Sequence, residues 1–368
     1  MKKLVSLVLI LLVCVCALSE APDTASGLQV HFIAVGRNDG ILIVCDGEAA
    51  FIDSGSHSRG DDCVKYMKQQ GIDHLKYYIG THAHTDHVGG APAILAAIPT
   101  DMILTNYKLA ITAMRDSAYN ANERGIVDST PWTEVHKGDE FVLGGAKLVC
   151  VGPNSLNKRA KYTDGLENEN SLIFRLEYGN HSFLFTGDTT NEILAKLLTA
   201  DPDLLKCTVF KSPHHNIGLH DEIAAKLQCE YYVFSTGTDD PPSLHQINNA
   251  RRAGGRVFIT SYNNSGTVVF YSDGETMTHT TQYKLDNWKL SASSSFTLRV
   301  GKHQSISVNM KPSRMIDTIN WASSNPAVAT VDPTNGKVTA VSEGVCYIRA
   351  LGFDDSYRII KVTVKAAK

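Results

Sequence analysis

Residues 81–90 read Thr-His-Ala-His-Thr-Asp-His-Val-Gly-Gly, and this stretch decides the fold. It places His82, His84, Asp86 and His87 within six positions. Imidazole nitrogens and carboxylate oxygens are the ligands that zinc and similar borderline metals prefer. A lone histidine is more often a core or surface residue, but four such groups at this density predict a metal site.

The cluster lies between a predicted strand and a predicted helix. Residues 77–79 are aromatic or apolar and are followed by Gly80, whereas residues 91–98 have helical character. Functional side chains of layered α/β folds usually collect on such strand-to-helix loops. We therefore expect the cluster at one edge of a sheet.

Three further predicted strands end in acidic or histidine residues. The strand over 49–52 ends at Asp53, and the strand over 182–185 leads through Gly187 to Asp188. The strand over 205–211 is followed by His214 and His215. If both halves of this region form one layered sandwich, these strand ends and the 82–87 cluster converge on one edge. Taken alone, Asp188 could equally cap the helix that follows it, and His181 is interpreted as a turn residue.

Length and composition bound the function class. The chain has 368 residues, 43% hydrophobic residues and a net charge of −3. These values predict two or more domains with real cores. They argue against a high-affinity nucleic-acid binder, so no stable nucleic-acid binding is expected, although a nucleic acid could still be a transient substrate.

The N-terminus resembles a secretory signal over residues 1–19. Lys2 and Lys3 precede an apolar run over 4–15, and small residues follow. The run is too short for a comfortable membrane span, so a secreted or cell-surface bacterial protein is expected. A lipoprotein anchor at Cys14 or Cys16 is the alternative, although each follows valine and not a small residue.

Six cysteines remain after the predicted signal, and they are scattered along the chain. Several lie in apolar stretches, so buried free thiols are the default interpretation. A disulfide stays open as an alternative, because spacing alone cannot select its partners.

The pattern changes near residue 290. Helical periodicity stops, and short alternating stretches appear over 296–300, 304–308, 345–350 and 359–364. Turn residues separate them, most clearly over 332–336. This pattern predicts a small all-β sandwich over 290–366.

The motif His82-x-His84-x-Asp86-His87, with Asp53, Asp188 and the late histidine pair, resembles the metallo-β-lactamase superfamily. Residues 71–73, 170–172, 185–188 and 211–215 also resemble the hydrolase domain of competence (DNA-uptake) proteins and related phosphorylcholine esterases. The resemblance implies an α/β fold, an αββα sandwich over 28–285. Residues 321–331 and 336–344 resemble the bacterial Ig-like domain (group 2), which implies an Ig-like sandwich over 290–366.

The resemblance also implies roles for individual residues. It implies two divalent metal ions, zinc or alternatively manganese. His82 and His84 would hold one ion, Asp86 and His87 the other, and Asp188 would bridge them.

One residue of the late pair would complete the second site. His215 is favoured as the ligand and His214 as the substrate contact, and their order stays open. Asp86 or Asp188 could accept a proton, and His214 could donate one to the leaving group. Asp53 would orient the histidine loop from outside the ligand shell.

The sequence departs from the family pattern in three places. Asn170 and Ser171 stand where many members have another ligand histidine, so full occupancy of the first site stays open. The usual Gly-Gln-Gly-Asp turn reads Gly36-Arg37-Asn38-Asp39, and Asn216 replaces a usual glycine. His245 resembles a later histidine that faces the site in the competence branch, and a surface position is the alternative.

We therefore expect a secreted dinuclear-metal hydrolase that acts on a small or polymeric phosphodiester, in nucleic acid or on the cell surface. Hydrolysis of a lactam, lactone or ester is a second hypothesis. A surface binding protein with a vestigial metal site is a third, against which the intact ligand set argues. The Ig-like region would be a spacer or would associate with the cell wall, and the fold alone cannot name its partner.

Overall fold

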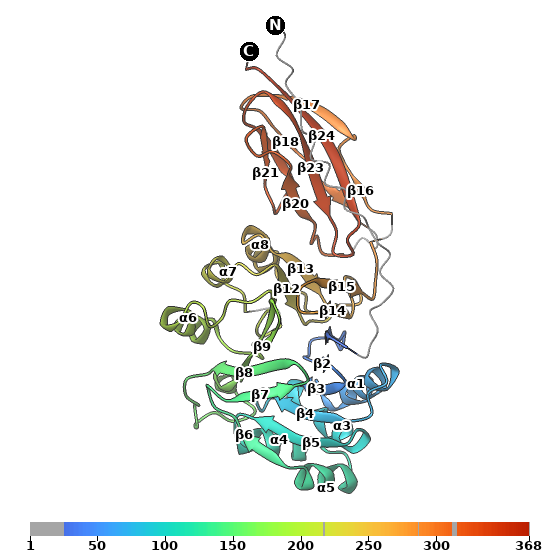
Figure 1. Ribbon diagram of the computed structural model, residues 1–368, viewed down its shortest axis with the longest axis vertical. Helices are drawn as coiled ribbons and strands as arrows, with labels where there is room; N and C mark the ends of the chain where they lie inside the picture. Colours follow the sequence, from blue (N-terminus) through green and yellow to red (C-terminus); the bar gives the residue numbers. More distant parts are fainter. Residues whose placement is uncertain (1–25, 216–217, 286, 311–314, 368) are drawn as a thin grey trace.

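The computed structural model describes residues 26–215, 218–285, 287–310 and 315–367 (Figure 1). The predicted signal over 1–19, its lipoprotein alternative and Asn216 lie outside these residues. Within the described residues, none of the helices combines the length and apolar character that a bilayer crossing requires.

The first sheet has the strand order β15-β14-β1-β2-β3-β4-β5-β6. From β15 to β3 along this order neighbouring strands pair antiparallel, whereas β3 to β6 run parallel. Parallel neighbours require crossover connections, and helices supply them here. The strands are β1 (Leu28–Phe32), β2 (Ile41–Cys45), β3 (Glu48–Ile52), β4 (Leu75–Gly80), β5 (Thr100–Thr105), β6 (Trp132–Glu134), β14 (Val268–Ser272) and β15 (Met277–Thr281). The helices are α1 (His57–Gln69), α2 (Thr85–Val88), α3 (Ala91–Ala97), α4 (Lys108–Ser117) and α5 (Ala121–Ser129).

The second sheet has the order β13-β12-β11-β10-β9-β8-β7. Strands β10 to β13 run parallel and are connected by helices, while β7 to β10 form antiparallel hairpins. The strands are β7 (Glu140–Leu143), β8 (Ala146–Gly152), β9 (Ile173–Tyr178), β10 (His181–Phe185), β11 (Val209–Lys211), β12 (Tyr231–Phe234) and β13 (Arg256–Ile259). The helices are α6 (Asn191–Ala200), α7 (Asp221–Leu227) and α8 (Leu244–Arg252), and a 3₁₀ turn η1 spans Gly165–Asn170.

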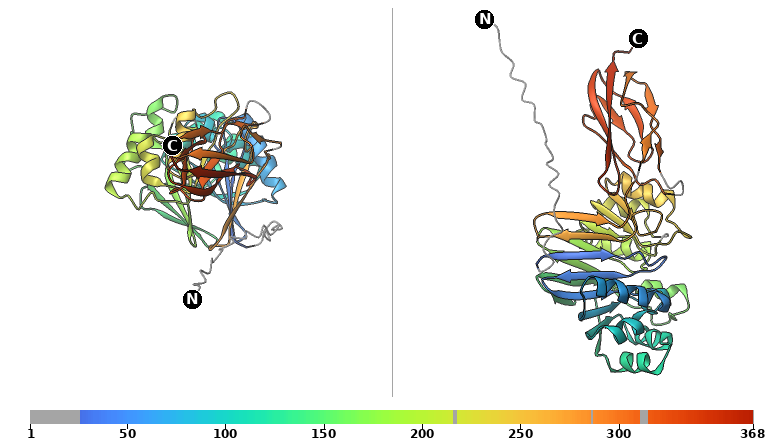
Figure 2. Two further views of the ribbon diagram at one scale, coloured as in Figure 1. Left: turned by 90° about the horizontal axis from the view of Figure 1, so that it is seen from above. Right: turned by 90° about the vertical axis from the view of Figure 1, so that its right-hand side faces the viewer.

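The two sheets pack face to face, with helices on their outer faces. Successive strand residues point to opposite faces. Ile41 and Ile43 therefore face the second sheet, whereas Leu42 between them packs against the helices of the first. Seen from above, the helices of the two halves lie on opposite outer sides, with the strands between them (Figure 2). The expected αββα sandwich is confirmed.

Some expected elements differ in extent. The sequence over 107–124 has a helical pattern but forms two helices, α4 and α5, because Asn120 caps α5 by accepting a hydrogen bond from the Glu123 backbone N–H at 2.9 Å. An Asn followed three residues later by Glu is a strong helix-start signal. The strand expected over 205–211 spans only β11, and β6, β15 and η1 were not expected.

The C-terminal region is all-β, as expected. One four-stranded sheet has the order β17-β24-β23-β20, a three-stranded sheet has the order β18-β22-β21, and β16 pairs with β19. Buried Trp321, Ile348 and Val362 contribute to its core. The stretch 304–308 is not one strand, because it divides between β18 and β19 of different sheets. The strands are β16 (Lys289–Leu290), β17 (Ser295–Arg299), β18 (His303–Ser305), β19 (Val308–Asn309), β20 (Asn320–Ser323), β21 (Ala329–Val331), β22 (Lys337–Ala340), β23 (Gly344–Leu351) and β24 (Tyr357–Lys365).

This region stands at one end of the molecule, beyond α8 and β13 (Figure 1). The guanidinium of Arg251, whose side chain is buried, donates hydrogen bonds to the carbonyl oxygens of Asp317 and Ile319. Asn320 donates to the Gly255 carbonyl at 2.9 Å. These bonds attach the C-terminal region to α8 and to the turn before β13.

Candidate metal centre

Asp53 fixes the orientation of His87. Its backbone is left-handed (φ 54°), and its buried carboxylate accepts hydrogen bonds from the Thr81 backbone N–H at 2.9 Å and the Thr81 hydroxyl at 2.7 Å. The same carboxylate lies 2.7 Å from His87 Nδ1. A carboxylate only accepts, so Nδ1 carries the hydrogen and Nε2 presents a lone pair on the opposite side of the ring.

His215 and His84 are oriented in the same manner by backbone carbonyls. His215 Nδ1 donates to the Ser235 carbonyl oxygen at 2.9 Å, and His84 Nε2 donates to the Asp164 carbonyl oxygen at 2.9 Å. A carbonyl oxygen cannot donate, so the other nitrogen of each ring is free to act as a ligand. His214 and His215 both have left-handed backbones, and this unusual turn after β11 places His215 in the protein interior.

His82 completes the set of four imidazoles. Its Nδ1 lies 3.1 Å from the Thr81 hydroxyl, whose hydrogen is donated to Asp53, so Nδ1 is the donor and Nε2 is free. His82 Nε2 lies 3.0 Å from His84 Nδ1. Two lone pairs at this distance repel each other unless a cation or proton lies near both. The pair therefore fits a metal ion.

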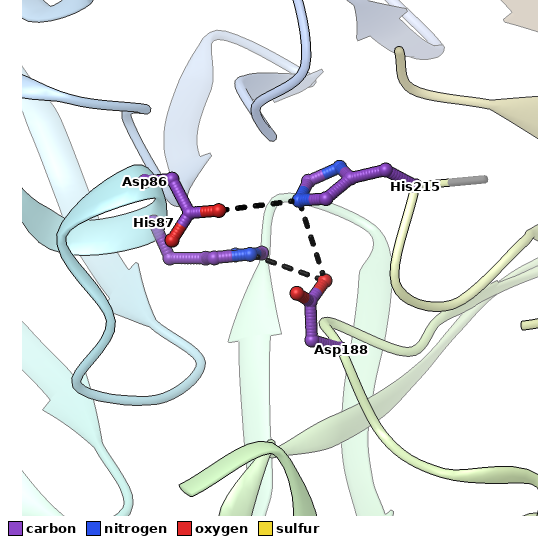
Figure 3. Close-up of side chains that lie close together, drawn as sticks. All are labelled: Asp86, His87, Asp188 and His215. Atoms are coloured by element: carbon purple, nitrogen blue, oxygen red, sulfur yellow. Dashed lines mark ion pairs between the residues drawn. The ribbon is translucent and has the colours of Figure 1, made fainter. Parts of the chain in front are cut away.

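Asp188 lies among these rings. Gly187 before it has φ +50°, and a Cβ there would stand 2.8 Å from the Thr81 hydroxyl, so glycine is required for this close approach. Asp188 Oδ1 lies 3.1 Å from His87 Nε2 and 3.6 Å from His215 Nε2. Asp86 Oδ2 lies 3.7 Å from the same His215 nitrogen (Figure 3).

Three buried atoms at this point lack hydrogen-bond partners within the described residues: His87 Nε2, His215 Nε2 and Asp188 Oδ1. Each could offer a ligand atom, and together with Asp86 these atoms lie within 4.8 Å of one another. Unpaired buried polar atoms are costly, so their convergence fits a site that binds a cation. The donor set of imidazoles and carboxylates fits a divalent metal.

Electrostatics at the cluster follow from burial and from the two aspartates. Burial lowers the pKa of His82 well below its usual value, and the neighbouring His87 adds to this effect. Burial opposes protonation of His87, but Asp188 and Asp53 raise its pKa well above the usual value. Burial likewise opposes ionisation of Asp188, but the charges of His215 and His87 hold its pKa well below the usual range. Of these three groups only His87 favours its protonated form, so the cluster favours positive charge beside the ionised Asp188, as a metal ion would also supply.

Other predicted residues support the cluster or lie beside it. His214 is part-exposed, and its Nε2 lies 3.8 Å from Asp188 Oδ2. The Ser171 hydroxyl accepts a hydrogen bond from the Asp188 backbone N–H at 3.1 Å. Asn170 is committed to loop contacts, since its Oδ1 accepts from the Asn157 backbone N–H at 2.6 Å. His245 is exposed on α8 beside α7, which matches the surface alternative.

Residues not singled out from the sequence hold the site together. Glu167 in η1 is buried, and its carboxylate accepts from the Ala83 backbone N–H at 2.9 Å and from the Tyr107 hydroxyl at 2.7 Å. Buried Lys211 pairs with Asp39, which lies 3.7 Å from His215 Nδ1 and 3.8 Å from His87 Nδ1. The family-like turn over Gly36–Asp39 could have indicated a role for Asp39. The sequence spacing of the metal-ligand motif gave no indication of Glu167.

Two family models match the chain. Residues 58–230 match the beta-lactamase superfamily domain, and residues 288–354 match the bacterial Ig-like domain (group 2). The chain carries a metallo-β-lactamase superfamily domain followed by a bacterial Ig-like domain. The match places residues 58–230 in this superfamily's domain, whose fold implies divalent metal ions, and the cluster described above supplies candidate ligands.

Two curated proteins are similar in sequence to this chain. Recombination protein 2 of Haemophilus influenzae is 24% identical over 266 residues, which cover 67% of this chain and 29% of that protein. ComE operon protein 3 of Bacillus subtilis is 24% identical over 214 residues, which cover 56% of this chain and 26% of that protein. The chain thus spans less than a third of the length of these relatives.

Two solved structures align with parts of the chain at low identity. A diphosphatase of the PhnP family aligns with a TM-score of 0.36 and 15% identity over 56% of this chain and 86% of that one. A metallo-β-lactamase from Cronobacter sakazakii aligns with a TM-score of 0.32 and 15% identity over 50% of this chain and 75% of that one. Both scores are below 0.5, and nothing about the activity of this chain follows from them.

Proposed function

We propose that the chain is a dinuclear-metal phosphodiesterase that is secreted or displayed on the bacterial surface. One observation supports this most strongly. Four imidazoles each donate from one ring nitrogen to a fixed oxygen and leave the other nitrogen free, and Asp188 lies among them. Such second-sphere bonds are typical of metal-ligating histidines.

In this proposal His82 and His84 would hold one ion, Asp86, His87 and His215 would hold the other, and Asp188 would be a ligand shared by the two sites. Four imidazoles with two carboxylates favour zinc, with manganese as the alternative. The ions supply an acidified water molecule and neutralise negative charge that develops on the substrate.

The surrounding side chains position the substrate and handle protons. Asp86 is part-exposed, so its carboxylate can accept a proton from an entering water molecule. His214 is also part-exposed and lies beside Asp188, in a position to contact the leaving oxygen. Burial lowers the pKa of His214, so near neutral pH it donates a hydrogen bond from a neutral ring. Glu167 accepts hydrogen bonds from both Ala83 and Tyr107. Helix α4 begins directly after Tyr107, so this pair of bonds holds α4 beside the His82–His84 turn.

The substrate class rests on chemistry and on the relatives. Two adjacent metals suit the in-line displacement of a phosphodiester, because both the attacking and the leaving oxygen carry negative charge. The name Recombination protein 2 associates one relative with nucleic acid. We therefore place phosphodiesters of nucleic acid or of a cell-surface polymer first, and propose that the Ig-like domain keeps the enzyme near the cell wall.

The test compares three proteins on three substrates. Wild type, His84→Ala and the surface control His245→Ala are loaded with zinc or manganese and assayed on bis-(p-nitrophenyl) phosphate, nitrocefin and a lactone panel. We expect wild type and His245→Ala to hydrolyse the phosphodiester, and His84→Ala to lose roughly a hundredfold or more of the rate together with bound metal. Turnover of nitrocefin or a lactone alone would replace the proposal with amide or ester hydrolysis. Bound metal without turnover of any substrate would favour a binding protein with a vestigial site.

A further inference from the structure

The outer face of the four-stranded Ig-like sheet has an unusual composition. Strands β17, β20, β23 and β24 contain no aspartate or glutamate, and they place four basic residues at outward positions, namely Arg299, Arg349, Lys361 and Lys365. Alternation separates the two faces of this sheet. On β23 the side chains of Cys346, Ile348 and Ala350 are buried, so Val345, Tyr347 and Arg349 point outward.

Large apolar side chains gather on this outer face. Eleven large hydrophobic residues are exposed in the described part of the chain, and four of them lie here: Val345, Tyr347, Tyr357 and Ile359, at 47–53% exposure. They occupy neighbouring positions on β23 and β24, which pair antiparallel. Exposed apolar side chains scattered singly are ordinary, but a cluster marks an interaction site.

Cationic side chains alternate with these aromatic and aliphatic ones. Lys361 lies directly across from Tyr347, and Arg349 directly across from Ile359. Both cations are exposed, and neither has an acidic partner within the described residues. The charge of these two side chains is therefore available to a ligand.

The charge of the whole chain is divided unevenly between its two parts. Residues 290–368 contain ten basic and five acidic residues, a net charge of +5. Because the full chain carries −3, residues 1–289 carry −8. An acidic catalytic part repels a polyanionic substrate at long range, whereas the basic Ig-like region attracts it.

The outer face is distinct from the surface that meets the hydrolase part. That junction uses Arg251 and Asn320, together with the carbonyl oxygens of residues 317, 319, 352 and 353. Tyr347 and Lys361 take no part in it. The four-stranded face thus remains open for a partner in the described structure.

Cations that alternate with tyrosine rings fit one occupant best. Phosphates pair with arginine and lysine, and unstacked bases stack on aromatic rings. A polyol-phosphate chain has no planar rings that could stack on tyrosine. A neutral polysaccharide has no anionic groups that could pair with arginine and lysine. We propose that the outer β23–β24 face binds single-stranded nucleic acid and holds it near the catalytic part. This inference rests on the proposed phosphodiesterase function and names its substrate class.

The test is fluorescence anisotropy with a fluorescein-labelled 20-nucleotide single strand, in the full-length His84→Ala background so that the strand is not cut. Arg349→Gln with Lys361→Gln removes two cations of the face. Lys302→Gln with Lys337→Gln is the control pair, because it removes the same charge away from the outer face. Lys337 lies on β22 of the three-stranded sheet, and Lys302 lies just before β18 of that sheet. Tyr347→Leu with Tyr357→Leu removes the rings but keeps apolar area, and the Tyr→Phe pair restores the rings. Thermal unfolding checks that each variant is folded.

We expect the Arg349–Lys361 pair to weaken binding about tenfold or more, and to make the slope of log affinity against log salt shallower by about 1.4. The control lysine pair should change affinity less than twofold. The Tyr→Leu pair should weaken binding about tenfold, and the Tyr→Phe pair should not. Equal losses from both cation pairs, or no loss from the Tyr→Leu pair, would overturn the proposal. Equal competition by a glycerol-phosphate polymer, matched for phosphate, would also overturn it.

Hydrolysis of bis-(p-nitrophenyl) phosphate, measured on the same substitutions with His84 intact, separates this inference from the proposed function. That small substrate does not need the outer face, so its rate should be unchanged in all face variants. Absence of hydrolysis in wild type would remove the phosphodiesterase function while leaving the binding result readable.

Discussion

Replacing Asp53 with asparagine probes how the protein sets the free nitrogen of His87. Asp53 Oδ1 accepts from the Thr81 backbone N–H, and Oδ2 accepts from the Thr81 hydroxyl and from His87 Nδ1. Asparagine offers one accepting oxygen and one donating NH₂. If the NH₂ faces the backbone N–H, two buried donors meet, at a cost of about 1–3 kcal/mol.

If the NH₂ instead faces His87, the ring must accept at Nδ1 and carry its hydrogen on Nε2. That arrangement avoids the clash with the backbone, but it removes the lone pair that faces Asp188. Loss of a second-sphere partner typically weakens metal binding by about 10–100-fold, or about 1.4–2.8 kcal/mol. We expect Asp53→Asn to show this loss at the His87 site, with a matching fall in phosphodiesterase rate.

The measurement is zinc or manganese affinity, by competition with a chromogenic chelator. Asp46→Asn is the matched control, because both oxygens of that carboxylate also accept hydrogen bonds, from the backbone N–H groups of Gly27 at 2.8 Å and Gly145 at 2.9 Å, but in an exposed turn. The control should bind metal as wild type does. A folded Asp53→Asn protein whose metal affinity stays within twofold of wild type would refute this reasoning.

Three further predictions follow from buried groups. Glu167→Gln cannot accept from both the Ala83 N–H and the Tyr107 hydroxyl, so metal affinity at the adjacent turn should fall several-fold in the chelator competition, and unchanged affinity would contradict this role. Burial lowers the pKa of His31 to about 4. On acidification the unfolded chain therefore binds a proton at His31 before the folded chain does, and the free energy of unfolding should fall by about 3 kcal/mol between pH 7 and pH 4. Urea titrations of wild type should show this fall, and those of His31→Gln should not. Cys207 and Cys229 have sulfur atoms 3.2 Å apart, so oxidised glutathione should link these two thiols in preference to others, as peptide mapping would show; a different pair would contradict the geometry.

The sequence was sufficient for the layered fold because its periodicities are local and strong. The continuous apolar run over 41–45 fits a strand that is buried on both faces. The helices that follow β3, β4 and β10 are the crossovers that parallel strands need. The convergence of Asp53, the 82–87 cluster, Asp188 and His215 followed from one rule, that carboxyl ends of parallel strands share an edge. The structure brings these residues together as that rule requires.

What the sequence lacked was information on pairing between distant residues. Glu167 reaches Ala83 across 84 positions, and Lys211 reaches Asp39 across 172. Neither contact produces a periodic pattern of residues from which it could be predicted. The choice between His214 and His215 likewise depended on two left-handed residues in succession, which no spacing argument predicts.

The most direct test of the metal centre is anomalous diffraction from crystals of the zinc-loaded protein, recorded on both sides of the zinc absorption edge. We predict two adjacent peaks, one bonded to His82 Nε2 and His84 Nδ1 and the other to His87 Nε2 and His215 Nε2, with Asp188 in contact with both. A peak elsewhere on the surface, or no peak among these side chains, would contradict the account.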